Sequence, residues 1–85
     1  MDRWCVLLDE PPVGRGGPSV RPVRYGASRE EALQQALDFA REYEPLEPAR
    51  IDGRQIFRMA GGTLLIGFDG SSERYVHLHV VENLT

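Results

Sequence analysis

The sequence predicts an α+β domain in which one amphipathic helix packs on a mostly antiparallel sheet of four or five strands. Three patterns lead to this prediction: a capped apolar stripe over residues 28–44, a Gly-Gly pair between two apolar runs, and strict alternation near the C-terminus. Eighty-five residues correspond to a single domain, residues 1–85. The expected order of elements is β, weak β, α, β, β, β.

The composition is that of an ordinary globular protein, with 41% hydrophobic and 27% charged residues. The apolar run Trp4–Leu8 stops at two acids and two prolines, and it is too short for a signal peptide or a membrane span. We therefore expect a cytoplasmic protein without a membrane partner. All ten basic residues are Arg, a pattern that we attribute to GC-rich codon usage in a bacterial source.

Two strands are expected before the helix. Trp4–Leu8 is apolar throughout, which favours a strand that is buried on both faces. Its one cysteine, Cys5, has no partner for an internal disulfide and is expected to be a buried apolar side chain. After a loop over residues 11–19, Val20–Tyr25 is predicted to be an edge or broken strand, because Pro22 has no backbone N–H group.

The helix is predicted over residues 28–44. Ser28 and Glu31 form the S-x-x-E pattern of a capping box. Apolar side chains then recur at three- and four-residue spacing, which places them on one helical face: Ala32, Leu33, Ala36, Leu37, Ala40 and Tyr43. The helix must end before Pro45, because the residue that precedes a proline is disfavoured in the α region.

A hairpin is predicted after a connector over residues 45–54. Gly61-Gly62 separates the apolar runs 55–60 and 63–68, and such a pair is typical of a two-residue type I′ turn. This turn would pair Phe57 with Ile66 and Met59 with Leu64, with all four side chains facing the helix.

The last strand is predicted over Glu73–Glu82, after a turn at residues 69–72. Val76, Leu78 and Val80 alternate with the two histidines. Loop length decides the register, and a one-residue slip would exchange the two faces. We choose the register that pairs Val76 and Leu78 with Ile66 and Leu64, because it keeps both imidazoles out of the core.

The sheet face opposite the helix is the predicted partner-binding site. The residues expected there are rich in large apolar and aromatic side chains: Ile56, Arg58, Leu65, Tyr75, His77, His79 and Val81. An exposed face of this kind is typical of a contact site. The sequence therefore favours a small non-enzymatic interaction module that binds a protein partner or forms a homodimer.

The pair His77 and His79 supports an alternative function, the binding of a metal or a small ligand. Two imidazoles at positions i and i+2 project from the same strand face, but a zinc site needs one or two further ligands. No such ligand stands at a diagnostic spacing, so the sequence predicts no metal and no cofactor.

Nucleic-acid binding is a second alternative. The segment 11–29 carries four arginines and no acid, whereas the rest of the chain holds six arginines and thirteen acids. Its basic residues are Arg15, Arg21, Arg24 and Arg29, and Tyr25 lies among them. The acidic pI of about 5.3 argues against this function. The segment Gly14–Gly17 matches neither the P-loop nor the dinucleotide-binding pattern.

No catalytic constellation is evident. Ser71 and Ser72 stand in a predicted turn and the histidines in a strand, and the sequence does not bring a nucleophile and a base into contact. A β-hairpin followed by the segment S-R-E-E-A-L-Q-Q-A-L resembles the start of HicB-like antitoxins over residues 4–43. The hairpin that follows the connector departs from that pattern, so the resemblance assigns no function.

Overall fold

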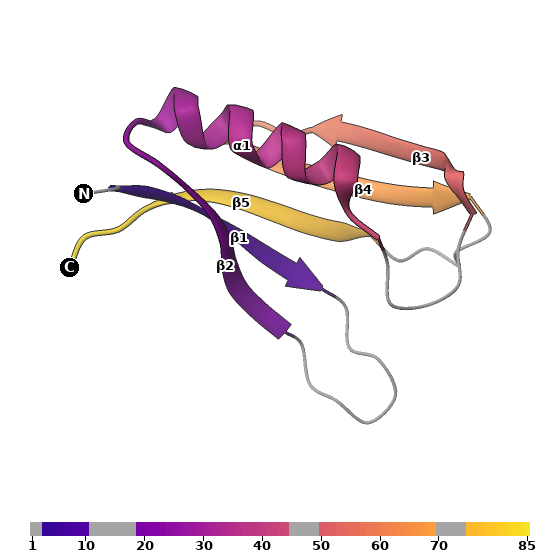
Figure 1. Cartoon of the computed structure of the whole chain (residues 1–85), viewed down its shortest axis with the longest axis horizontal. Coiled ribbons are helices and arrows are strands. Elements are labelled where there is room, and N and C mark those ends of the chain that lie inside the picture. The colour runs from indigo at the N-terminus through magenta and orange to yellow at the C-terminus, as the bar shows by residue number, and fades with distance from the viewer. Residues whose placement is uncertain (1–2, 11–18, 45–49, 70–74) are drawn as a thin grey trace.

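A computed structural model of the chain describes residues 3–10, 19–44, 50–69 and 75–85. In chain order its elements are β1 (Trp4–Glu10), β2 (Ser19–Gly26), α1 (Arg29–Glu42), β3 (Arg50–Arg58), β4 (Thr63–Asp69) and β5 (Val76–Glu82). The five strands form one sheet in the order β2-β1-β5-β4-β3, and every neighbouring pair is antiparallel. The helix lies across one face of this sheet (Figure 1). The predicted fold class and element order are confirmed.

The two N-terminal strands lie at one side of the sheet, with β2 at the edge and β1 next to it. In β1, Val6 and Leu8 face the helix and are buried, whereas Cys5 and Leu7 are half-buried on the other face. The prediction of a strand buried on both faces was therefore wrong. Among the described residues there is one helix, and it covers one face of the sheet. β2 is an edge strand whose register shifts opposite Val6 and Leu7, as Pro22 led us to expect.

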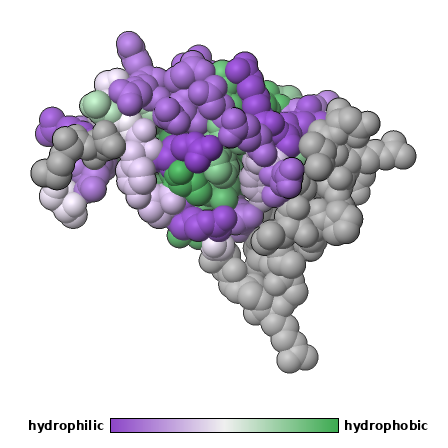
Figure 2. All heavy atoms as spheres, viewed as in Figure 1, coloured by the Kyte–Doolittle hydropathy of each residue, from purple (hydrophilic) through white to green (hydrophobic). Residues whose placement is uncertain are grey.

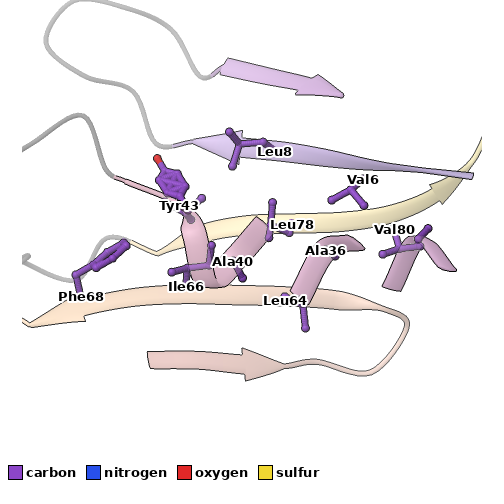
Figure 3. Packing of buried hydrophobic residues seen from close by; sticks show 12 residues of the cluster. Val6, Leu8, Ala36, Ala40, Tyr43, Leu64, Ile66, Phe68, Leu78 and Val80 are labelled. Carbon is purple, nitrogen blue, oxygen red and sulfur yellow. The ribbon is translucent and has the colours of Figure 1, made fainter. Parts of the chain in front are cut away.

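The helix begins and packs as predicted. The Ser28 hydroxyl accepts a hydrogen bond of 3.1 Å from the Glu31 backbone N–H. Ala32, Ala36 and Ala40 are fully buried against the sheet, and Figure 3 shows Ala36 and Ala40 among the core side chains of the strands. Because these side chains are small, α1 can lie close to β1, β2, β4 and β5.

The C-terminal end of the helix is held by β3. The Arg54 guanidinium donates hydrogen bonds to the backbone carbonyls of Ala40, Arg41 and Tyr43, and it lies 5.2 Å from the centre of the Phe68 ring. A cation at this end interacts favourably with the helix dipole and satisfies carbonyl groups that have no partner within the helix.

The β3–β4 hairpin differs from the prediction by one residue. Ile56 pairs with Ile66 and Phe57 with Leu65, whereas the sequence led us to pair Phe57 with Ile66. The loop contains three residues instead of two, because Met59 N–H donates to the Thr63 carbonyl at 2.7 Å across residues 60–62. Phe57 is therefore exposed on the face opposite the helix, and Ile56 packs against the core.

The two glycines of this loop have an unusual backbone conformation. Gly61 and Gly62 have φ angles of 86° and 90°, a region that other residues rarely adopt. The Gly62 carbonyl accepts a 3.3 Å hydrogen bond from Val80 N–H, which ties the loop to β5. A side chain at position 62 would meet Arg29 and Leu33 of the helix. The turn is therefore packed under the start of α1, and this contact decides the register.

The last strand has the predicted register. Leu64 pairs with Leu78 and Ile66 with Val76, so that both leucines and both β-branched residues face the helix. The histidines consequently point to the other side. Of the loop predicted over residues 11–19, Ser19 begins β2 and residues 11–18 lie outside the described residues. Residues 70–74 also lie outside them, and Arg15 and Ser71 with these two segments.

Candidate functional site

The face of the sheet opposite α1, which we call the open face, is the main candidate site. Successive side chains of a strand point to opposite faces, so residues that alternate with the core positions lie on this side. Its described side chains include Cys5, Leu7, Asp9, Val20, Pro22, Tyr25, Gln55, Phe57, Thr63, Leu65, Tyr75, His77, His79 and Val81. No helix or strand of the described residues covers them.

Five of the seven residues predicted for this face lie there. Leu65, Tyr75, His77, His79 and Val81 share the open face, as the register of β4 and β5 required. The other two do not.

Ile56 and Arg58 lie on the helix side instead. The one-residue shift of the hairpin places Ile56 beside Ile66, and Arg58 beside the buried Leu64. Phe57, which the sequence had assigned to the core, takes their place on the open face.

Several open-face residues were not predicted. Leu7, Asp9 and Tyr25 belong to β1 and β2, and they reach this face because β1 pairs with β5 at the centre of the sheet. The alternation of Val6, Leu8 and Glu10 with residues 5, 7 and 9 was the available signal. That signal was weak because both sets of side chains in the first run are apolar.

The open face is mostly apolar and its aromatic side chains are exposed. Phe57 is 44% exposed, Tyr75 47%, Tyr25 54% and Val20 56%. The Tyr75 ring lies directly over Gly67, where a Cβ atom would stand 2.9 Å from the ring. Glycine at position 67 therefore leaves room for the ring beside β4.

Three ionisable side chains lie near the centre of the open face. His79 Nε2 stands 3.5 Å from Asp9 Oδ2, and its Nδ1 stands 3.2 Å from the Thr63 hydroxyl. The ring of His77 stacks on that of His79, with centroids 5.8 Å apart and planes 17° apart. His77 lies directly across from Asp9 in the β1–β5 pair.

These residues do not form a metal site in the structure. Among the described residues, no group of three or more His, Cys, Asp and Glu side chains is placed so that it could hold an ion. Zinc sites need three or four protein ligands, so we expect no stoichiometric zinc at His77 and His79. Elemental analysis of protein purified without a His tag checks this prediction, and one bound zinc per chain would contradict it.

Arg21 and Arg24 of the predicted basic segment lie away from the exposed Tyr25. Arg21 Nη1 stands 2.6 Å from Glu10 Oε1, and Arg24 Nη2 stands 3.3 Å from Glu42 Oε2. Both arginines are on the helix side of β2, whereas Tyr25 is on the open face. The combination of free arginines with a stacking tyrosine, on which nucleic-acid binding depended, is therefore not present at these residues.

Hydrophilic side chains dominate the helix side, as Figure 2 shows. The described residues line two hollows on this side. One, of about 350 Å³, lies at the end of α1 and contains the Glu10–Arg21 and Arg24–Glu42 pairs. The other, of about 510 Å³, runs between α1 and β3 over Leu33, Leu37 and Ile56. Neither contains a buried polar group that is directed at an absent ligand.

No family model matches this sequence, and comparisons with curated proteins and with solved structures gave no match. No helix among the described residues is long and apolar enough to cross a membrane. The function is therefore inferred from the chemistry of the open face.

Proposed function

We propose that this protein is a non-enzymatic interaction module that binds another protein through the open face. The observation that carries the proposal is a sheet face that no described helix or strand covers, on which aromatic and aliphatic side chains adjoin one another. Isolated apolar residues are common on protein surfaces, but a contiguous patch of several hundred Å² usually marks a contact site.

The chemistry of the face defines the kind of partner. Its apolar side chains surround a small polar centre made by Asp9, His77 and His79. A matching surface is also apolar, with few charges. Among the described residues of the basic segment, Arg21 and Arg24 lie on the helix side and Tyr25 on the open face, which favours a protein partner over a nucleic acid.

Site-specific photo-crosslinking in the source cell tests the proposal. A benzophenone amino acid replaces Phe57 or Tyr75 on the open face, and Gln34 on the exposed side of α1 serves as the control. We expect protein adducts from the two open-face positions and few from position 34. The same adducts should disappear when Leu65→Glu is added, because a carboxylate in an apolar contact is strongly unfavourable.

Equal crosslinking at positions 57 and 34 would contradict the proposal. Adducts that persist unchanged in the Leu65→Glu background would contradict it as well, because they would not depend on the open face.

A further inference from the structure

We infer that the partner is a second copy of this chain, and that two open faces pack together in a symmetric dimer with the histidines at its centre. The inference rests on the proposed function and specifies its occupant.

The low charge of the open face is compatible with a second copy. The chain carries a net charge of −3, so two copies repel each other at most orientations. Of the open-face side chains named above only Asp9 is an acid, and it stands 3.5 Å from a histidine nitrogen. The arginines of β2 and Arg58 lie on the helix side. A contact between two open faces therefore brings together one of these carboxylates from each copy and none of these arginines.

The size of the face meets the requirement of a stable dimer. Five strands about 4.8 Å apart and about seven residues long give a footprint on the order of 500 Å² per copy. The accessible area of a surface with protruding side chains exceeds its footprint, so two copies bury about 1,000 Å² or more. A specific interface needs about this area.

Symmetry places the histidines opposite one another. β5 is the central strand of the sheet order β2-β1-β5-β4-β3. A two-fold axis that passes between the two faces at their centres sets β5 of one copy over β5 of the other, whether the axis runs along the strands or across them. His77 and His79 of both copies then occupy the middle of the contact, and β1 and β4 flank them with Leu7, Asp9 and Leu65.

The face is partly preorganised for such packing. The Tyr75 ring already lies against Gly67, and the imidazole of His79 lies between Asp9 and Thr63. Side chains that are already ordered lose less conformational entropy on binding.

Sedimentation equilibrium on the full chain tests the inference. At pH 7.5 we expect twice the chain mass of 9.6 kDa. Leu65→Glu and Phe57→Glu should each weaken dimerisation by about 100-fold or more, because both copies lose an apolar contact at the interface. Leu33→Glu, which adds the same charge to a half-buried position on the helix side, should leave the dimer intact.

A wild type that is monomeric at millimolar concentration and pH 7.5 would overturn the dimer. If positions 57 and 75 then crosslink to a different protein in cells, the proposed function survives and only the inference fails. A dimer that is insensitive to both Leu65→Glu and Phe57→Glu would show that the chains associate through another surface, which also overturns the inference.

Discussion

At the scale of single residues, Glu10 joins three elements on the helix side. It is the one buried charged residue among those described, and its carboxylate accepts hydrogen bonds of 2.6 Å from the Tyr43 hydroxyl and from Arg21. A buried carboxylate is costly unless it is hydrogen-bonded or paired. Both requirements are met here, and the two bonds connect β1 to β2 and to the end of α1. Figure 3 shows the Tyr43 ring between Leu8 and Phe68.

Tyr43 allows the contribution of this cluster to be measured. Tyr43→Phe leaves the ring but removes the hydroxyl that donates to Glu10, so we expect the free energy of unfolding to fall by about 1–3 kcal/mol. Urea denaturation at pH 7 checks this value. The matched control is Tyr75→Phe, which alters an exposed ring and should change stability by less than about 0.5 kcal/mol.

The raised pKa of Tyr43 predicts how the stability of the protein changes at alkaline pH. Burial, the hydrogen bond to Glu10 and the negative charge of Glu10 raise the pKa of Tyr43 above its ordinary value of 10.0. The unfolded chain therefore loses this proton first as the pH rises. The contribution of the Tyr43 hydroxyl to the free energy of unfolding is fully present below about pH 10 and is lost as the pH rises further. Stability should fall less steeply above pH 10 in Tyr43→Phe than in the wild type, and equal slopes would contradict the assignment.

At the scale of elements, the helix depends on its cap and on its alanine stripe. The hydrogen bond from Glu31 N–H to Ser28 satisfies one backbone donor that has no partner within the helix. Ser28→Ala should therefore destabilise the protein by about 1 kcal/mol. Ser19→Ala, at the exposed start of β2, should have little effect. Thermal unfolding of the two variants provides the comparison, and equal losses would argue against a specific capping role.

The observed register of the β3–β4 hairpin exchanges the positions that the turn sequence predicted for Ile56 and Phe57. Ile56 packs against the core and Phe57 is exposed. Ile56→Ala should therefore cost about 2 kcal/mol and Phe57→Ala less than about 1 kcal/mol. Denaturation in dilute solution, where the chains are monomeric, avoids a contribution from association. A larger loss of stability for Phe57→Ala than for Ile56→Ala would favour the two-residue turn instead.

At the scale of the whole molecule, one helix and one sheet form two layers, and the second face of the sheet has no layer over it in the described residues (Figure 1). Stable domains usually bury the apolar faces of their sheets against another element. A chain of 85 residues has little stability to spare. Dimerisation would supply the missing layer and the stability that comes with it.

This predicts that thermal stability depends on protein concentration. Because a dimer dissociates when it unfolds, mass action raises its melting temperature with concentration. For a domain of this size, a hundredfold increase at pH 7.5 should raise Tm by on the order of 5 °C. Leu65→Glu should remove the dependence. Scanning calorimetry over that concentration range distinguishes the two cases, and a constant wild-type Tm would contradict the dimer.

Much of the architecture could be predicted from patterns among residues that are close together in the sequence. The S-x-x-E cap and the alanine spacing determined where α1 begins and which side it buries. The alternation of Val76, Leu78 and Val80 kept both histidines out of the core. Pro22 marked β2 as an edge strand. Each of these features follows from local geometry, so the sequence alone was sufficient to predict it.

Tertiary contacts decided the composition of the open face. Whether Ile56 or Phe57 faces the helix depends on the Gly61-Gly62 loop, which bonds to Val80 and packs under the first turn of α1. The pairing of the first strand with the last brings Asp9 beside His79. Both features require segments that are distant in sequence to meet, and their positions follow from the packing of the whole sheet. The predicted helix and strands could therefore be correct while the site differed by one residue in one strand.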